Sequence, residues 1–407
     1  MLYTKNPNSL DNVNNSSDHI SVWTVIILIS FNPILTFINT ITNIFIYQGF
    51  VYDTLILYLI LIVLLLKATF QTFKNLNSQL LNIILIYASI FVFTFLFLPE
   101  NFRAAFTSLD NFIGSPLFYA IFSFIGYLII LQIRSLDNLF FGIIKMSKII
   151  IPISIINYFL LLNKGISSSY MVISYDSLLF IVIAIFSSLQ LGDRKLGVLG
   201  IVGILFILFL GARGPIVSLS FALLIFLVFG RFSKTKKIII GLLFVFTVIA
   251  MYSNFNKTIT DLDNSLNKAG IQSRNLNLYL EGRLSYDSGR SDIQKVLINN
   301  TTILGHGIFG DRATLVYAHN LFIEIFYQWG FIIGFILSVW IVLLIYNGLK
   351  TKNNNLKFLI IAFLSAGFFK LQFSGSYLTE INFYILIALC QRSRAVSYNY
   401  GKKLVTL

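Results

Sequence analysis

The chain is 407 residues long, with 57% hydrophobic residues and only 11% charged residues, and its mean hydropathy is +0.83. Soluble domains carry about 25% charged residues, so this composition excludes a soluble enzyme. The net charge of +14 resides mostly in short loops between apolar runs, which is typical of membrane topology and not of nucleic-acid binding. Its single cysteine excludes a disulfide framework or a cysteine metal cluster.

Apolar runs follow one another along nearly the whole chain. A helix needs roughly 20 apolar residues to cross a hydrocarbon core about 30 Å thick. The sequence predicts about twelve such segments, at 22–42, 49–66, 80–98, 116–133, 148–163, 176–191, 197–211, 214–230, 238–253, 320–346, 358–373 and 379–391. We therefore expect an all-α polytopic membrane protein. Residues 21–253 would hold its first nine transmembrane helices and residues 320–391 the last three.

The chain ends and the basic residues indicate the orientation. Residues 1–20 are polar and Asn-rich, which predicts an uncleaved tail and not a signal peptide. With this tail inside, the short outer loops hold only Arg103, Lys164 and Arg213. The positive-inside rule therefore places the N-terminal tail and the C-terminal tail, 392–407, in the cytoplasm.

Residues 254–319 form a long polar segment that this topology places on the outer (periplasmic or extracellular) face. A loop of this length is usually functional or disordered. The chain has no visible internal repeat, which disfavours a two-fold transporter architecture. Nucleotide-binding, zinc-protease and C-x-x-C motifs are also missing, so the candidates for chemistry are arginines, one histidine and a few carboxylates.

Arg213 lies in a tight outer turn between two short predicted spans. An ionisable group at that depth is costly unless it faces a cavity or an anion, so it is a candidate site residue; snorkelling to lipid headgroups is the alternative. Arg290 precedes a predicted short helix at 291–299, capped by Ser288 or Ser291, where an arginine and free amides favour an anion. Pairing with nearby aspartates is the alternative there.

His319 stands where the tenth predicted span begins. The positive end of a helix dipole opposes protonation, so a neutral imidazole that accepts a proton is one interpretation, and an interfacial or capping histidine is the other. Asn320 and Glu324 follow on the same helix face. His306 is assigned to a glycine turn, and Lys370 and Glu380 to a structural ion pair.

The order of these residues resembles the bacterial O-antigen ligase/polymerase superfamily. The stretch Ile303-Leu-Gly-His-Gly-Ile308 is followed by the segment 317–332, which begins Tyr-Ala-His-Asn and continues with a Glu and a Gly. An Arg-Gly pair at an outer turn, Arg213-Gly214, and the loop arginine Arg290 complete the pattern. The likeness covers residues 205–340 in motifs and the whole chain in topology.

This resemblance implies a GT-C-like helical glycosyltransferase that works without metal or cofactor. Its donor would be a glycan on undecaprenyl diphosphate, on the outer face of the bacterial cytoplasmic membrane. Arg213 and Arg290 would bind the diphosphate, and His319 would be the general base, oriented by Asn320 and Glu324. Further substrate contacts are expected from Arg283, Arg312 and Tyr317.

Three functions stay open at this point. The first is a polymerase that joins lipid-linked repeats into O-antigen or capsule chains, and the second is a ligase that moves finished chains onto lipid A-core. The third is a flippase without catalysis, which the large outer loop and its Arg/His set disfavour. The expected partners are membrane lipids, the lipid-linked oligosaccharide, and flippase and chain-length regulator proteins; nucleic acid is not among them.

Overall fold

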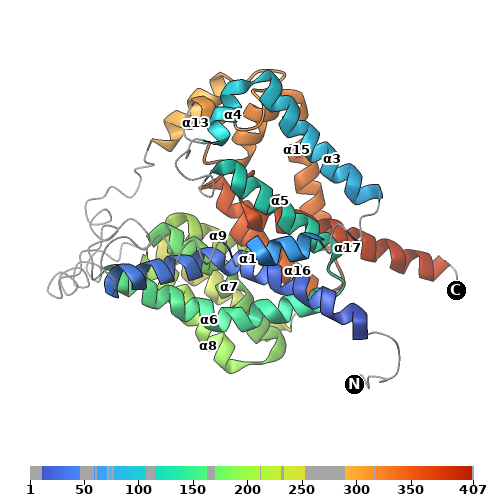
Figure 1. Cartoon of the computed structure of the whole chain (residues 1–407). Helices are drawn as coiled ribbons and strands as arrows, with labels where there is room; N and C mark the ends of the chain where they lie inside the picture. The colour runs from blue at the N-terminus through green and yellow to red at the C-terminus, as the bar shows by residue number, and fades with distance from the viewer. Residues whose placement is uncertain are drawn as a thin grey trace.

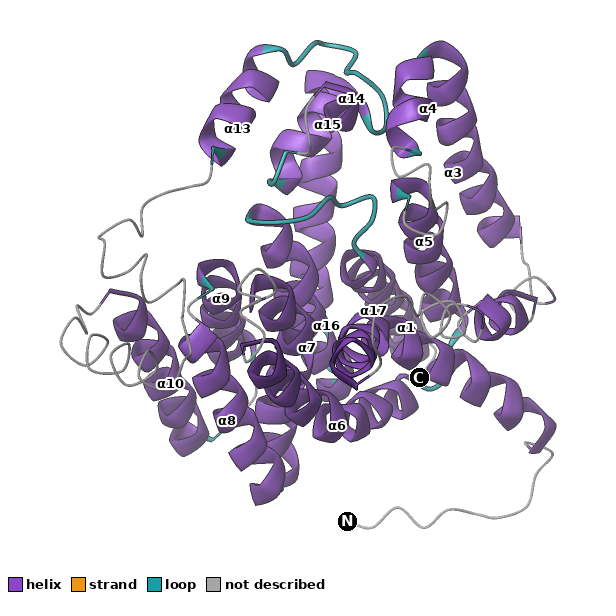
Figure 2. Ribbon diagram, turned by 60° about the vertical axis from the view of Figure 1, so that its left-hand side comes forward, coloured by secondary structure: helices purple, strands orange, loops and turns teal. Residues whose placement is uncertain are grey.

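A computed structural model provides the structure, and it describes residues 12–45, 59, 62–70, 74, 78–106, 115–162, 170–210, 212–230, 233–252, 289–314 and 318–405. Throughout these ranges the regular elements are helices, and none is a strand (Figure 2). Six helices are long and apolar enough to cross a membrane. The expected all-α class is therefore confirmed for the described residues, and the chain has the character of a helical membrane protein. The twelve spans and the GT-C-like arrangement stay predictions.

The helices follow the apolar runs of the sequence (Figure 1). In chain order they are α1 (Asn12–Phe45), α3 (Ser78–Phe97), α4 (Pro99–Ala105), α5 (Pro116–Gln132), α6 (Leu136–Leu162), α7 (Tyr170–Leu191), α8 (Arg194–Leu210), α9 (Arg213–Phe229), α10 (Lys234–Tyr252), α13 (Arg290–Asn299), α14 (Gly310–Thr314), α15 (Leu321–Leu349), α16 (Asn354–Phe363) and α17 (Ile381–Val405). A π-helical segment, Leu364–Phe369, and a 3₁₀ turn, Lys370–Gln372, continue α16.

Several helix ends lie outside the expected segments. Helix α1 begins at Asn12, within the expected N-terminal tail, and α17 runs to Val405 through the expected C-terminal tail. The second expected span, 49–66, lies mostly outside the described residues. The described part of the long polar segment, 289–314 together with the residues from 318, contains α13 and α14.

Helix α7 is the most enclosed of the six long apolar helices. On one side Phe186 stacks on Phe226 of α9, with ring centroids 3.4 Å apart. On another side α8 approaches closely, because a side chain at Gly200 would overlap Ile185. Small residues at such contacts let helix backbones approach where burial from water supplies no driving force between spans. Helix α7 therefore packs closely against both α8 and α9.

One end of the bundle joins basic side chains to helix C-termini. Lys357 donates to the carbonyl oxygen of Phe229, at the end of α9, at 3.0 Å. Arg392 donates to the Ile130 carbonyl of α5 at 3.1 Å, and Lys236 donates to the Leu189 carbonyl of α7. The last carbonyls of a helix lack partners inside it and carry partial negative charge, so these bonds are favourable.

Helix α15 is broken at Gly330, whose backbone angles, φ 75° and ψ 176°, interrupt the helical ladder. The glycine-rich loop before α14 fills the break: the amide of His306 donates to the Tyr327 carbonyl, and that of Gly307 to the Gln328 carbonyl, both at 2.9 Å. Gly305 and Gly307 both have positive φ, so His306 lies in a glycine turn, as the sequence indicated. The glycine turn at 303–308 and helix α15, which contain most of the residues that carry the resemblance, are thus hydrogen-bonded to each other.

Candidate active site

The N-termini of three helices lie close to one another next to Phe373. Arg290, the first residue of α13, donates from Nη1 to the Phe373 carbonyl oxygen at 2.7 Å. Its Nη2 lies 4.0 Å from the sulfur of Met171, in the first turn of α7. Gly214, the second residue of α9, lies against Tyr175 and Phe373. We call this region the arginine corner, defined by Arg213, Gly214, Arg290, His319 and Phe373.

Arg213 is the first residue of α9, and its side chain is exposed. The residue before it, Ala212, makes no side-chain cap to the helix, so the first amides of α9 have no side-chain acceptor there. Gly214 allows the close approach to α7, because a side chain at this position would overlap the Tyr175 hydroxyl. The Arg-Gly pair therefore combines an accessible guanidinium with a tightly packed helix start.

Helix α13 begins one residue earlier than expected, and its N-cap is Gly289, with φ 78°. The expected serine cap is wrong for Ser291, which lies inside the helix; Ser288 lies outside the described residues. Glycine adopts this left-handed conformation at no steric cost. The cap has no side-chain acceptor for the first amides, and Arg290 adds its charge to the positive end of the helix.

His319 lies between the buried Ala318 and the helix cap Asn320, with a left-handed φ of 53°. Gln294 of α13 donates to the Ala318 carbonyl at 3.4 Å, which ties α13 to the start of α15. Burial first, and then the charge of Arg290, lower the pKa of His319 to about 4. The imidazole is therefore neutral at pH 7 and can accept a proton. Burial is the main cause, whereas the expectation from the sequence rested on the helix dipole, and the role of His319 as a base stays a prediction.

Glu324 lies one turn inside α15, fully buried in a polar network. One carboxylate oxygen accepts from the Ser376 hydroxyl and, at 3.3 Å, from the Gln328 amide; the other accepts from the Tyr377 backbone amide at 3.2 Å. Gln328 also donates to Asp311 at 2.7 Å, and burial raises the pKa of Asp311. The network joins α14 and α15 to the loop that carries Phe373.

The other expected site residues have different surroundings. The Asn320 side chain caps α15, accepting from the amides of Phe322 and Ile323. Arg312 lies on α14 with its guanidinium 5.9 Å from the Phe309 ring, next to the buried network. The hydrogen bonds of Asn320 and Glu324 give both a structural task, so their role in orienting His319 stays a prediction. Arg283 and Tyr317 lie outside the described residues.

Sequence reasoning missed Tyr175, Phe373 and Gln328. Gln328 stands four residues after Glu324, a helical spacing that could have indicated a pair. Nothing local to Phe373 marks it, because its contribution is a backbone carbonyl. The expected ion pair between Lys370 and Glu380 is confirmed.

The arginine corner has the chemistry of an anion site beside a proton acceptor. Helix N-termini direct amide groups and partial positive charge outward, and arginine forks bind phosphate oxygens in pairs. A neutral imidazole next to them can take a proton from a hydroxyl group. Within the described ranges, no group of three or more His, Cys, Asp or Glu side chains is arranged to hold a metal ion.

Comparison with known proteins gives no family for this chain: it matches no protein-family model, no curated protein and no solved structure. The function therefore has to be argued from the geometry of the site.

Proposed function

We propose that this protein is a membrane glycosyltransferase that takes its glycan from a polyprenyl diphosphate, and specifically a polymerase of lipid-linked repeat units. One observation carries the proposal: α9 and α13 each begin with an arginine next to Phe373, which contacts Gly214 and accepts from Arg290, and the neutral His319 lies close enough to Arg290 to be affected by its charge. A cation at the positive end of a helix is unfavourable by itself, and an anion bound beside it makes the position favourable. A diphosphate is an anion of suitable charge for two arginines.

The proposed reaction balances without a cofactor. An acceptor hydroxyl oxygen attacks the anomeric carbon of the donor, the bond from that carbon to the diphosphate oxygen breaks, and the hydroxyl proton passes to His319. Arg213 and Arg290 stabilise the negative charge that grows on the leaving diphosphate. Cleavage of the bond between the sugar and the diphosphate supplies the free energy for glycosyl transfer.

The topology expected from the basic residues is compatible with this role. It places the starts of the expected spans 176–191, 214–230 and 320–346 on the outer face of the cytoplasmic membrane. Helices α7, α9 and α15, which contain these segments, begin at or next to the arginine corner. The basic side chains Lys236, Lys357 and Arg392 bind the opposite ends of the neighbouring helices. An outer site needs a substrate that is already activated, which a lipid diphosphate is.

The test is a gel of surface polysaccharide from cells with and without the gene, complemented with wild type, Arg213→Ala or His319→Ala. A polymerase predicts loss of long chains, with single repeats still on the lipid anchor, for the deletion and both variants. Loss of every attached repeat, with polymer stranded on undecaprenyl diphosphate, would indicate the ligase instead. Normal chain lengths from both variants, at normal membrane levels, would refute the catalytic assignment.

A transporter of the same lipid-linked glycan is the second candidate. The observation in its favour is a cavity among the spanning helices lined by three charged residues, Asp176, Lys370 and Glu380. A transporter predicts repeat units trapped on the cytoplasmic face when the gene is deleted. Loss of Arg213 or His319 would then leave polymer chemistry intact, which separates it from the first candidate.

A further inference from the structure

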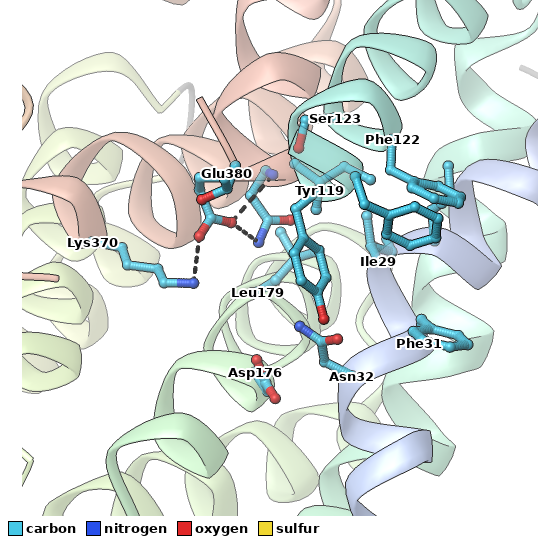
Figure 3. A pocket seen from close by; sticks show the side chains of 15 residues that line it. Ile29, Phe31, Asn32, Tyr119, Phe122, Ser123, Asp176, Leu179, Lys370 and Glu380 are labelled. Atoms are coloured by element: carbon cyan, nitrogen blue, oxygen red, sulfur yellow. Dashed lines mark hydrogen bonds and ion pairs between the residues drawn. The ribbon is translucent and has the colours of Figure 1, made fainter. Parts of the chain in front are cut away.

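A second polar site lies next to the arginine corner and is not used by the proposed chemistry. It is a cavity of about 100 Å³ between α1, α5, α7 and the start of α17. Figure 3 shows the Tyr119 hydroxyl, the Asn32 amide and the Asp176 carboxylate pointing toward one another, with Lys370 and Glu380 on a neighbouring wall. These groups come from helices far apart in sequence, so the fold brings them together.

Not every polar group of this cavity has a hydrogen-bond partner. Glu380 pairs with Lys370 and accepts from the Asn382 amide at 3.0 Å. The Asn382 side-chain oxygen is buried without a hydrogen-bond partner among the described residues. Asn32 lies within an apolar span of α1 yet is exposed, so it marks an open side of the cavity. A polar group inside a span is expensive unless something satisfies it.

The charged and neutral polar groups of the cavity indicate which kind of ligand it would bind. A cation would meet the ammonium of Lys370, and an anion would meet the carboxylates of Asp176 and Glu380. A neutral hydroxylated ring is repelled by neither kind of charge, because each of its hydroxyl groups can donate to a carboxylate and accept from an amide or ammonium. The rings of Tyr119 and Phe122 supply an apolar wall, and such a wall with a few polar groups is typical of small-molecule sites.

The size and place of the cavity narrow the ligand further. An apolar cavity of about 150 Å³ binds benzene, so this cavity admits part of one ring at its open side and excludes an oligosaccharide chain. Its walls also join the arginine corner. Lys370 lies over the Tyr175 ring at 5.5 Å, Asp176 follows Tyr175 in α7, and Tyr175 lies against Gly214.

We infer that this cavity binds the hydroxylated edge of one neutral sugar ring of the lipid-linked glycan, the ring nearest the diphosphate. The inference rests on the proposed function for the identity of the diphosphate at the arginine corner. Asp176 and Asn32 would accept from and donate to ring hydroxyls, and the Lys370–Glu380 pair would position Asn382. The site would thus set which first sugar the enzyme takes.

The experiment measures binding of a free oligosaccharide to the full chain in lipid nanodiscs. The probe is the repeat unit released by mild acid from the lipid-linked intermediates of the source cell, so it carries no diphosphate. Saturation-transfer NMR should detect binding to wild type. Asp176→Asn should weaken binding about tenfold, because it replaces a charge-assisted hydrogen bond. Tyr119→Phe, which changes one hydroxyl and nothing in the helix backbone, should weaken it about threefold.

Lys350→Gln is the matched control, since it removes a charge from the exposed C-cap of α15 and none from the cavity. It should bind the free repeat as wild type does. Equal binding by wild type, Asp176→Asn and Tyr119→Phe, or no binding by folded wild type, would overturn the sugar site.

The two proposals fail separately. If Arg213→Ala and His319→Ala abolish polymer while the free repeat does not bind, the catalytic assignment stands and the sugar site falls. If binding depends on Asp176 while both variants make normal polymer, the sugar site stands and the proposed catalysis falls.

Discussion

The two ends of the bundle differ in how basic side chains lie relative to the helix termini. At one end, Lys236, Lys357 and Arg392 meet helix C-termini and donate to the last carbonyls. At the other, Arg213 and Arg290 are the first residues of α9 and α13. A cation stabilises a helix C-terminus and destabilises an N-terminus, by about 0.3–1 kcal/mol each.

Under the proposed function, the difference separates residues that stabilise helix ends from residues that would bind an anion. The C-terminal cations complete hydrogen bonds that the helices themselves lack. The N-terminal arginines add charge where the helix already supplies it, so a bound anion would make their position more favourable. Helices α8 and α10 also begin with a cation, Arg194 and Lys234. A cation at a helix start therefore marks the site only together with other observations, here the bond of Arg290 to Phe373 and its closeness to His319.

Reversing the charge at each end should produce the largest contrast. Arg213→Glu places a favourable charge at the start of α9, so the melting temperature should stay level or rise slightly. Glycan transfer should fall at least about 100-fold, because one stabiliser of the leaving diphosphate is lost. Transfer is measured with purified protein and lipid-linked repeats, and unfolding by a thermal scan in detergent.

Lys350→Glu is the matched control at the other kind of helix end. Lys350 is the exposed C-cap residue of α15, lying 3.9 Å from the Tyr346 ring. The reversal should lower the melting temperature slightly and leave transfer unchanged. Equal loss of transfer in both variants would show that charge alone, and not its place, matters.

Breaking the kink of α15 should have the next largest effect. Gly330→Ala puts a side chain at φ 75° and against the Ile303 carbonyl, which should cost about 3 kcal/mol. The docked loop would lose its place and the arginine corner its support, so folded yield and transfer should fall together. Gly241→Ala is the control, because nothing lies near the added carbon in α10; it should be neutral or slightly stabilising.

Removing a C-terminal cation should change stability alone. Lys357→Met keeps the length and most of the volume of this buried side chain and removes its bond to the Phe229 carbonyl. The free energy of unfolding should fall by about 1–2 kcal/mol, and transfer by the folded fraction should stay as in wild type. A large loss of transfer at unchanged stability would contradict the division between the two ends.

Composition and apolar runs predicted the helices, because a lipid-facing helix must be apolar along its whole length. The exposed Phe93, Leu96 and Phe97 of α3 illustrate this exterior. The motif residues also marked the corner, since Arg213, Arg290 and His319 each stand at or next to a helix start.

The rest depends on contacts between distant segments, which local periodicity does not encode. Phe373 contributes a carbonyl oxygen, which every residue has. Gly289 takes the cap in place of a serine because the chain needs a left-handed turn there. Asp176 is the first residue of the expected span 176–191, and only the fold puts Asn32 and Lys370 around the same cavity.

The smallest expected effect is a shift in a pH profile, and it sharpens the assignment of His319. Its folded pKa of about 4 lies below the ordinary 6.5, so folding favours the neutral imidazole. The stability from this neutral form is present above pH 6.5 and is lost as pH falls from 6.5 toward 4. The same neutral form is the one able to act as a base.

The two kinetic constants should therefore titrate differently. The profile of kcat/KM reports the free enzyme and should fall only below pH 5, with an apparent pKa near 4. The profile of kcat reports the complex, where the negative diphosphate offsets the charge of Arg290 and raises the pKa of His319. Arg290→Gln should raise the apparent pKa in kcat/KM, because it removes the charge of Arg290, which helps to lower the pKa of His319. Identical profiles for wild type and Arg290→Gln, in both constants, would mean that His319 is not the group that titrates, and the base would have to be sought elsewhere in the corner.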